Sequence, residues 1–182
     1  MADSRSALQD EIKQNRPFHA GGAEVAVGIL RTAAVLERRY NQIVLKRGIT
    51  IQQYNVLRIL RGAGDAGMPT LVIRDRMIHE APGITRLIDR LEQSGLARRE
   101  RPSADRRQVM CFITDGGVKL LADLDAEVVA ADHAAVCMLN PDEQRQLTDL
   151  LTAVRTGQAR ASAEGVAESA QRGQPPRHPS SV

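Results

Sequence analysis

The stretch from Ala81 to Thr114 constrains the fold of this chain more than any other stretch. Its first part repeats apolar residues at steps of three and four positions, namely Ile84, Leu87, Ile88 and Leu91. This spacing predicts a helix with one apolar face. Pro82 suits the first turn of that helix, where a missing N–H costs nothing, and Gly95 suits its end, where the backbone turns left-handed. The opposite face is left with Gly83, Arg86, Asp89 and Arg90.

The second part of the stretch predicts a hairpin of two strands. Residues 96–102 follow the helix, and after them Val109, Cys111 and Ile113 alternate with neighbours that face the other way, which is the period of a strand. Five arginines lie in or beside the connection: Arg98, Arg99, Arg101, Arg106 and Arg107. A loop of this charge cannot be buried, so we expect its guanidinium groups to meet water or an anion. A short helix followed by an arginine-tipped hairpin is typical of a winged helix on DNA.

Helical spacing recurs on both sides of this stretch. Thr50 with Gln53 predicts a capping box, and Thr70 is expected to cap the short helix before the turn. Asn140 followed by Pro-Asp-Glu is the strongest helix start in the chain. We therefore predict helices at about 23–47, 50–61, 69–77, 114–138 and 140–156, a flexible arm at 1–20 and a disordered tail at 157–182.

The predicted fold class is mainly α with a small β-wing. A winged helix-turn-helix covers about 50–114, and long helices at about 23–47 and 114–156 complete one domain at 21–156. The flanking helices have more apolar surface than a small winged helix can cover, and such patches mark interfaces. The simplest closure is a two-fold dimer, so we expect these to be dimerisation helices. Two recognition helices would then lie about 34–36 Å apart if they enter successive major grooves.

The charge distribution points to the same part of the chain. Residues 58–107 hold eleven Arg against seven Asp or Glu, whereas residues 108–182 hold six basic against ten acidic side chains. The planar fork of arginine suits phosphates and guanine edges; the alternative is a solvated basic face. No apolar run approaches the roughly 18 residues of a membrane span, and the N-terminus lacks the apolar stretch of a signal peptide. We therefore expect a soluble, cytoplasmic protein.

The sequence contains no pattern typical of catalysis or of a cofactor site. Two cysteines, Cys111 and Cys137, form no disulfide framework. Cys111 lies on a predicted strand and is expected to pack as a small hydrophobe rather than to sense oxidants. The four His and two Cys lack the spacing of metal ligands. Without a nucleophile, paired carboxylates or a phosphate loop, we expect neither an enzyme nor a cofactor.

The chain resembles the MarR family of winged-helix transcription regulators over roughly Ala23 to Thr156. The resemblance is sharpest at Asp105-Arg106-Arg107 followed by Ile113-Thr114, which is similar to the family's wing and the start of its next helix. The segment from Pro82 to Glu92 looks like the family's recognition helix, and Gly95-Leu-Ala-Arg-Arg looks like its entry into the wing. What the resemblance implies is a homodimeric repressor that binds an inverted repeat in double-stranded DNA.

The resemblance also implies a set of DNA-contacting residues. Arg107 would reach into the minor groove, where an arginine reads the enhanced negative potential of a narrow groove, and Asp105 would hold the wing turn. Arg86 would be the best placed for a guanine contact. The full expected set is Pro82, Gly83, Thr85, Arg86, Arg90, Arg74, Asp105, Arg106 and Arg107.

Two alternatives remain open at this stage. Relatives bind small anionic or phenolic molecules in a cleft between the dimer helices and the DNA-binding lobe, so Arg38, Arg39, Tyr40 and Tyr54 would line an effector site, or else they are packing and surface residues. The whole chain could instead be a winged-helix protein-interaction module without a specific DNA site. Steep salt dependence of binding would favour DNA.

Overall fold

The computed structural model describes residues 5–100 and 109–172, with side chains described up to residue 161. The chain divides into two units, Met1–Ala135 and Val136–Val182. Within the described ranges, no helix is both long and apolar enough to span a membrane. The elements of the first unit are α1 (Ala7–Glu11), α2 (Gly21–Leu45), α3 (Ile51–Ala63), the 3₁₀ turn η1 (Gly64–Ala66), β1 (Met68–Pro69), α4 (Thr70–Asp75), α5 (Ile84–Gln93), β2 (Ala97–Glu100), β3 (Met110–Ile113) and α6 (Asp115–Ala135).

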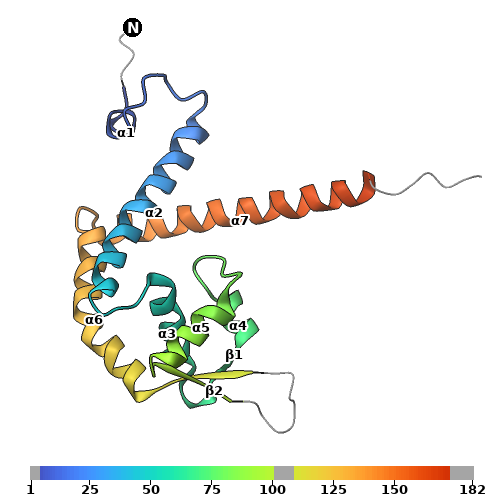
Figure 1. Ribbon diagram of the computed structural model, residues 1–182. Coiled ribbons are helices and arrows are strands. Elements are labelled where there is room, and N and C mark those ends of the chain that lie inside the picture. Colours follow the sequence, from blue (N-terminus) through green and yellow to red (C-terminus); the bar gives the residue numbers. More distant parts are fainter. Residues whose placement is uncertain (1–4, 101–108, 173–182) are drawn as a thin grey trace, which may run out of the picture. The chain divides into compact units, whose positions relative to one another are not determined.

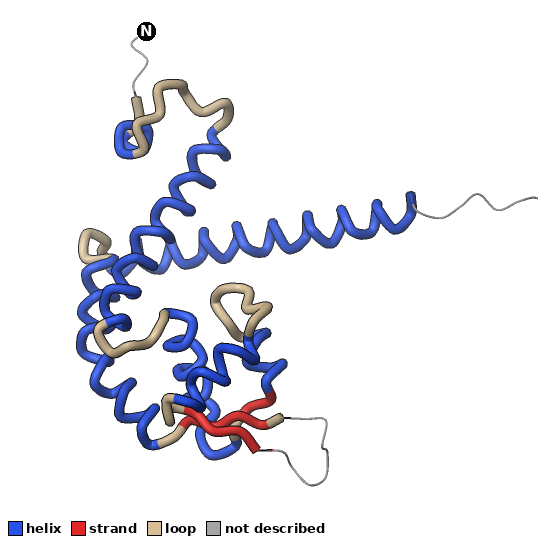
Figure 2. The backbone as a smooth tube through the Cα atoms, in the orientation of Figure 1, coloured by secondary structure: helices blue, strands red, loops and turns tan. Residues whose placement is uncertain are grey.

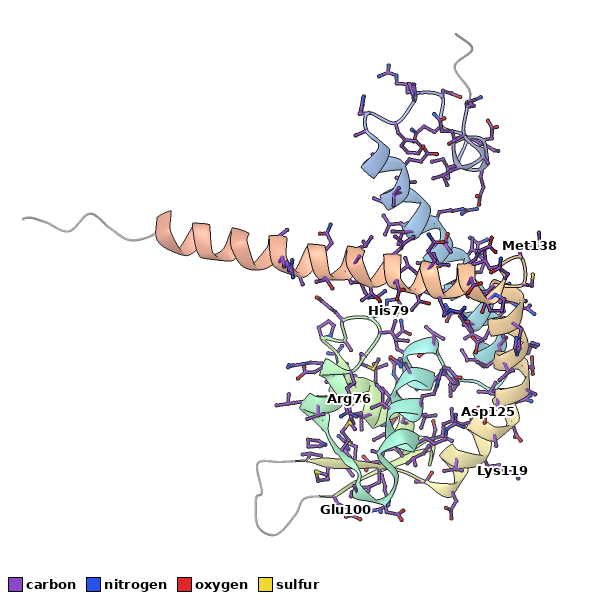
Figure 3. The ribbon with its side chains drawn as sticks, turned by 180° about the vertical axis from the view of Figure 1, so that it is seen from behind. Arg76, His79, Glu100, Lys119, Asp125 and Met138 are labelled. Atoms are coloured by element: carbon purple, nitrogen blue, oxygen red, sulfur yellow. The ribbon has the colours of Figure 1, made fainter. Side chains whose placement is uncertain are left out.

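The first unit is built around α3, which contacts α2, α5, α6 and strand β3 (Figure 1). Thr50 caps this helix as predicted: its Oγ1 accepts from the backbone N–H of Gln53 at 3.2 Å, and the Gln53 side chain accepts from Thr50 N at 2.9 Å. Arg61, in the last turn, donates to both carboxylate oxygens of Asp125, the shortest bond being 2.9 Å. Figure 3 labels Asp125 on α6. The core around α3 consists of fully buried aliphatic side chains, among them Val56, Leu57, Leu60, Ile73, Ile88, Leu91, Leu121 and Leu124.

The strands form a small antiparallel sheet at one end of this unit, in the order β1-β3-β2 (Figure 2). Cys111 of β3 lies between Met68 of β1 and Arg99 of β2. Strand β1 was not predicted, because two residues are too short for an alternating pattern to be visible in the sequence. Gly67 precedes it at φ +61°, and a Cβ there would lie 2.4 Å from the Phe112 ring, so this position requires glycine.

Several helix ends differ from the predicted ones. Helix α4 ends at Asp75 rather than near Met77, and Thr70 does not cap it: the N-cap is Pro69, without a side-chain bond. Thr70 Oγ1 instead lies 3.5 Å from the carbonyl oxygen of Val109. Helix α6 ends at Ala135, three residues before the predicted end. The prediction placed the end later because Val136 is apolar and has the helical spacing of the preceding residues, but the helix stops one residue before it.

The arm before α2 contains a short helix that packs on α2. Ser6 caps α1, and its Oγ accepts from Gln9 N at 3.3 Å. Gln9 is buried and donates to the carbonyl oxygen of Arg16 at 3.1 Å. Glu11 forms an ion pair with Arg31 of α2 at 2.7 Å. Within the described part of the arm, α1 and these contacts give residues 6–16 a defined structure, whereas the sequence predicts a flexible arm over residues 1–20.

The second unit is dominated by α7 (Pro141–Arg172). Asn140 caps it as predicted: Asn140 Oδ1 accepts from Glu143 N at 3.0 Å, and Glu143 Oε2 accepts from Asn140 N at 2.8 Å. The structure continues this helix to Arg172, so residues 157–172 are helical where we predicted the start of a disordered tail. The prediction counted large apolar residues, whereas the Ala, Glu, Gln and Arg of this segment have high intrinsic helix propensity.

Candidate nucleic-acid interface

Helix α5 has two distinct faces. Ile84, Ile88 and Leu91 are at most 5% exposed and pack into the core. The exposed face carries Thr85, Arg86 and Arg90, and Pro82 and Gly83 are exposed just before the helix. The helix begins at Ile84, with Gly83 as its N-cap, two residues later than the predicted start at Pro82. The five residues predicted on this helix to contact DNA are therefore together on one accessible surface.

A side chain of α3 stabilises the turn between α4 and α5. Asn55 Oδ1 accepts a hydrogen bond from the backbone N–H of Ile78 at 2.9 Å. Arg74, at the end of α4, is exposed and forms an ion pair with the adjacent Asp75 at 3.0 Å. Arg74 is thus accessible to a phosphate, but the neighbouring carboxylate competes for its guanidinium group. Asn55 had no signal in the sequence, because an Asn inside a helix gives no indication of a partner 23 residues away.

Arg99 of β2 links the wing to helix α5. Its Nη2 lies 2.6 Å from Asp89 Oδ1 and 2.5 Å from Glu92 Oε2, and its Nε donates to Glu92 Oε2 at 2.9 Å. Its backbone N–H also donates to Glu92 Oε1 at 3.1 Å. Hydrogen bonds from Arg99 lower the pKa of the Glu92 carboxyl, and the bond to Glu92 raises the pKa of Arg99. Arg99 therefore positions α5.

Arg98 is also engaged within the lobe. Its guanidinium carbon lies 4.2 Å from the centroid of the Phe112 ring, a cation–π geometry, and the side chain pairs with Glu100. The wing arginines are predicted to meet water or an anion, and for Arg98 and Arg99 this is confirmed. Arg98 is exposed and pairs with Glu100, and Arg99 pairs with Asp89 and Glu92, so the anions are carboxylates of the chain itself. Asp105, Arg106 and Arg107 lie outside the described residues.

The end of α5 is tied to the start of α6. Gly95 has φ +68°, which confirms the predicted left-handed turn. Thr114 Oγ1 donates to the Gly95 carbonyl oxygen at 2.6 Å and accepts from Gly117 N at 3.2 Å. The approach is close: a Cβ on Gly117 would lie 2.3 Å from the carbonyl oxygen of Leu96. The recognition helix, the hairpin and α6 thus meet at a point that admits no larger residue.

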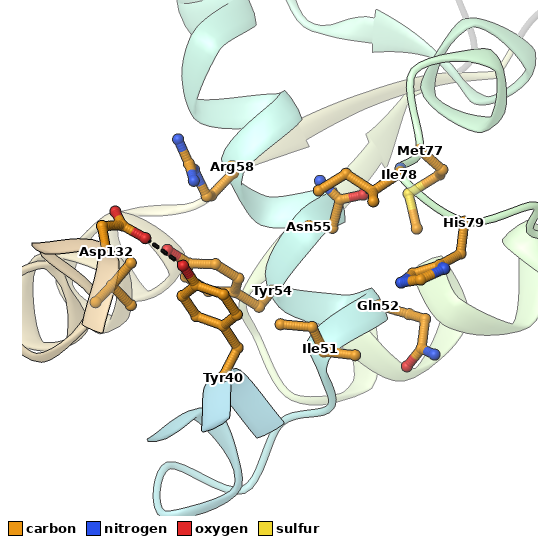
Figure 4. A pocket seen from close by; sticks show the side chains of 11 residues that line it. Tyr40, Ile51, Gln52, Tyr54, Asn55, Arg58, Met77, Ile78, His79 and Asp132 are labelled. Carbon is orange, nitrogen blue, oxygen red and sulfur yellow. Dashed lines mark hydrogen bonds between the residues drawn. The ribbon is translucent and has the colours of Figure 1, made fainter. Parts of the chain in front are cut away.

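A pocket of about 210 Å³ lies between α2, α3 and α6, beside the turn that precedes α5 (Figure 4). Tyr40 and Tyr54 both line it, as predicted for an effector site. Arg38 and Arg39 are exposed on α2 and are not among its lining residues. Asp132 lines it, a residue that sequence reasoning missed because it lies 92 positions from Tyr40.

One hydrogen bond crosses this pocket between helices α2 and α6. The Tyr40 hydroxyl donates to Asp132 Oδ1 at 2.5 Å (Figure 4). Burial, followed by the hydrogen bond to Asp132 and the charge of Asp132, raises the pKa of Tyr40 to about 12. Burial likewise raises the pKa of Tyr54. Both phenols are therefore neutral at physiological pH, and Tyr40 is a hydrogen-bond donor.

The two cysteines occupy different environments. Cys111 is fully buried on β3, and burial raises the pKa of its thiol, so the reactive thiolate is disfavoured there. Cys137 is exposed and lies just before α7. Among the described residues, no three His, Cys, Asp or Glu side chains lie close enough together to hold a metal ion.

Comparison with known proteins identifies the architecture. A model of the MarR family matches residues 47–108. The HTH-type transcriptional regulator MhqR of Bacillus subtilis is 30% identical over 132 residues, which cover 69% of this chain and 90% of MhqR. The crystal structure of a MarR transcription factor from Planctomyces limnophilus is 37% identical, with a TM-score of 0.58, and the match covers 75% of this chain and 99% of that one.

A more distant match comes from the structure of BpsR from Bordetella bronchiseptica, a protein whose DNA binding is regulated by 6-hydroxynicotinic acid. It has 20% sequence identity and a TM-score of 0.65, and the match covers 72% of this chain and 98% of BpsR. At this identity the likeness concerns the fold alone. Taken with the match to MhqR, the comparisons show that the chain belongs to the MarR family of DNA-binding transcriptional regulators, a non-enzymatic family.

Proposed function

We propose that the protein is a cytoplasmic, homodimeric repressor that binds an inverted repeat in double-stranded DNA and is released by a small-molecule effector. The observation that carries this proposal is the exposed face of α5, where Thr85, Arg86 and Arg90 stand together on a helix whose other face is buried. A recognition helix of this kind reads base edges from the major groove with its N-terminal residues. The domain we assign to this function is 21–156.

The roles of the basic residues follow from their positions. Arg86 lies in the first turn of α5, where its planar fork can bind a guanine edge with two hydrogen bonds. Arg90, one turn later, and Arg74, on α4, are better placed for phosphates, which position the protein without reading sequence. Arg107, with Asp105 and Arg106, completes the proposed DNA-binding set on the strength of the resemblance in sequence.

Exposed apolar side chains support the homodimer. Within the first unit, α2 exposes Val25, Leu30 and Val35, at 57%, 70% and 49%. Within the second unit, α7 exposes Leu147, Leu150 and Val154, at 41%, 58% and 41%. Leu147, Leu150 and Val154 have the three- and four-residue spacing of one helix face, and contiguous apolar surface of this kind marks a protein interface. Val25, Leu30 and Val35 recur every five residues and are therefore spread around α2. A second copy is the simplest occupant for the α7 face, because a two-fold axis pairs like with like.

The pocket beside Tyr40 supports regulation by a small molecule. It touches α3, which lies behind α5, and it touches α2, one of the predicted dimerisation helices. A ligand changes DNA affinity only by binding the competent and incompetent arrangements unequally. A pocket between these helices is placed where such a difference can arise. BpsR, a protein of the same fold, has its DNA binding regulated by a small molecule, 6-hydroxynicotinic acid.

Fluorescence anisotropy with DNA from upstream of the protein's own gene tests the proposal. Arg86→Ala is expected to cost about 1–3 kcal/mol of specific binding, and Arg90→Ala to weaken specific and random DNA alike and to reduce the salt slope by about one. Arg155→Ala, an exposed arginine on α7, removes the same charge and serves as the control. The result contrary to the proposal is binding to genomic DNA that never exceeds binding to random DNA and that Arg86→Ala leaves unchanged. The protein-interaction module would then be preferred.

A further inference from the structure

Helix α6 is attached to other elements of the first unit at three levels along its length. Near its start, Gly117 lies so close to the hairpin that a Cβ would meet the backbone carbonyl oxygen before β2 at 2.3 Å. In its middle, Asp125 pairs with Arg61 of α3, and near its end Asp132 accepts the hydroxyl of Tyr40 on α2. Successive levels are about two helical turns apart, or about 10–12 Å. The middle attachment joins α6 to α3, the helix against which α5 packs.

The pair of Arg61 with Asp125 engages both nitrogens of the guanidinium fork and both carboxylate oxygens (Figure 3 labels Asp125). Arg61 Nη1 donates to Asp125 Oδ2 at 2.9 Å and to Oδ1 at 3.2 Å, and Nη2 donates to Oδ1 at 3.2 Å. Arg58, one turn earlier on α3, lies over the Tyr54 ring instead, 5.9 Å from its centroid. A planar guanidinium that binds both oxygens of a carboxylate fixes the relative orientation of the two groups as well as their distance.

The apolar contacts of α3 and α6 constrain this orientation less. Leu57 of α3 and Leu121 of α6 are completely buried in one core. Burial of apolar area is favourable but non-directional, so it holds the two helices together without selecting one angle as strictly as a bidentate pair does. The side chains of Arg61 and Asp125 are 36% and 47% exposed, and exposed ion pairs contribute little to stability. We therefore expect the pair to act on the geometry of the fold more than on its stability.

The angle between α3 and α6 matters because of what each helix supports. Helix α3 supports α5, whose exposed face is proposed to read DNA, and α6 leads along the chain to α7, which exposes the proposed dimer face. In a two-fold dimer, a rotation at this junction occurs once in each protomer. Recognition helices about 34–36 Å apart are each about 17 Å from the axis. A rotation of about 10° therefore displaces each by about 3 Å, close to the base-pair step of about 3.4 Å.

We propose that Arg61 and Asp125 are positioning residues that set the separation of the two recognition helices, and with it the spacer length that the dimer accepts between the half-sites of its inverted repeat. The inference rests on the proposed function and names the geometric property of the operator that the protein selects. The pair acts through α3 on α5 and needs no contact with DNA. Base-contacting residues such as Arg86 then determine which half-site is read, and the pair determines how far apart two half-sites lie.

Fluorescence anisotropy with duplexes that differ only in the spacer tests the proposal. The inverted repeat is the one that the full-length wild type selects from random-sequence DNA, and its spacer is then shortened or lengthened by one and by two base pairs. We expect the wild type to bind its preferred spacer at least tenfold more tightly than a spacer longer by two base pairs. Arg61→Met keeps the aliphatic stem and removes the fork, and it should reduce this ratio at least threefold. A loss of stability alone would weaken binding to every spacer alike and leave the ratio unchanged.

Two further variants show whether geometry or charge explains the ratio. Arg61→Lys keeps the positive charge but cannot bind both carboxylate oxygens with a planar fork, so it should reduce the ratio as Arg61→Met does. Arg31→Met is the matched control: it breaks the ion pair with Glu11, whose side chains are similarly exposed at 40% and 49% and lie on neither α3 nor α6, and it should leave the ratio unchanged. A ratio in Arg61→Met equal to that of the wild type overturns the inference. A wild-type ratio in Arg61→Lys alone assigns the effect to charge and overturns the fixed orientation.

Double electron–electron resonance separates this inference from the proposed function, because it needs no DNA. Nitroxide labels on Gln93→Cys of α5 and Ala134→Cys of α6, both exposed positions, report the distance between these helices within one chain. The labelled chain carries Cys137→Ser, keeps the buried Cys111 and is diluted with unlabelled protein. We expect a single narrow distance distribution without the Arg61→Met substitution and a broader or shifted one with it.

The two measurements together identify which statement fails. Identical distance distributions with and without Arg61→Met overturn the positioning role, whatever DNA the protein binds. A changed distribution in a protein that selects no inverted repeat contradicts the proposed function and the selection of a spacer, while the orienting role of the pair stands. Specific binding to an inverted repeat with a spacer ratio that Arg61→Met leaves unchanged supports the proposed function and overturns this inference.

Discussion

The recognition helix and the pocket are both supported by α3, but they are held together by different kinds of contact. Beside α5, Arg99 engages Asp89 and Glu92 through several charged hydrogen bonds, and its side chain is only 28% exposed. Across the pocket, a single hydrogen bond joins Tyr40 to Asp132. Multiple bonds on one rigid guanidinium fix a geometry, whereas one bond between two helices can be replaced by a ligand. A regulator needs the first kind where it reads DNA and the second where it is switched.

The largest effect is expected where the two regions share a support. Leu57 of α3 is completely buried, so Leu57→Ala should lower the free energy of unfolding by about 2–5 kcal/mol and should impair DNA and ligand binding together. Urea denaturation followed by circular dichroism measures the loss. Leu71→Ala, at a residue that is 62% exposed, should change stability by about 0.5 kcal/mol or less. Equal losses in the two variants would mean that α3 is not the common support.

A substitution at Gly117 should affect the two regions to different extents. Its Cβ would meet the Leu96 carbonyl oxygen at 2.3 Å, so Gly117→Ala is expected to cost about 1–3 kcal/mol through overpacking and to weaken DNA binding, while the alkaline ionisation of the pocket tyrosines stays unchanged. Gly62→Ala on α3 meets nothing within 4 Å and should be neutral or stabilising by up to about 1 kcal/mol. The prediction fails if Gly117→Ala shifts the ionisation of the pocket tyrosines and leaves the anisotropy-measured affinity for DNA unchanged.

The Arg99 cluster gives the next effect in size. Because the three side chains are partly exposed, each pair is worth about 0.2–1 kcal/mol, and Arg99→Ala should cost about 1 kcal/mol in urea denaturation. Loss of the fixed orientation of α5 should weaken specific DNA binding about tenfold, which is about 1.4 kcal/mol. Arg98→Ala removes the same charge from the same strand and is the control. If both variants lose the same DNA affinity, charge and not positioning explains the effect.

The same cluster predicts a pH dependence. Arg99 lowers the pKa of Glu92 below its ordinary value of 4.5. A group whose pKa is lower in the folded state stabilises the fold above its unfolded pKa, and this contribution is lost as pH falls through the folded value. The stability difference between wild type and Glu92→Gln should therefore be present at pH 6 and shrink below about pH 4.5. A difference that is the same at pH 6 and pH 3 would contradict the role of the Glu92 charge.

The contrast between local and distant contacts also explains how much could be predicted from the sequence. The two faces of α5, the caps at Thr50 and Asn140 and the turn at Gly95 depend on residues a few positions apart, and the structure confirms them. Asp89 and Glu92 face the hairpin within ten residues of Arg99, yet charge alone did not distinguish an ion pair from a DNA contact.

Contacts between distant parts of the chain could not be predicted. Asp132 meets Tyr40 across 92 positions, and Asn55 holds Ile78 across 23. Neither residue stands in a local pattern, and only the packing of α2, α3 and α6 brings them to the pocket. The short strand β1 has no local pattern either, because it has only two residues, and its hydrogen-bonding partner β3 lies about 40 residues later.

The smallest expected effect, on tyrosine ionisation, tests the pocket side most directly. The chain has two tyrosines and no tryptophan, and both tyrosines line the pocket, so alkaline absorbance reports on this site without interference. Tyr40 should ionise near pH 12, and Tyr54 also above its ordinary 10.0. Asp132→Asn should lower the midpoint of Tyr40, because it removes a charge that opposes the phenolate, and Asp123→Asn, at an exposed position of α6 outside the pocket, should not. The raised pKa also means that this contribution to stability is complete below pH 10 and is lost as pH rises toward 12. Two tyrosines that ionise together near pH 10 in the folded protein would show that Asp132 does not contact Tyr40. The pocket would then lack the single hydrogen bond that distinguishes it from the Arg99 cluster.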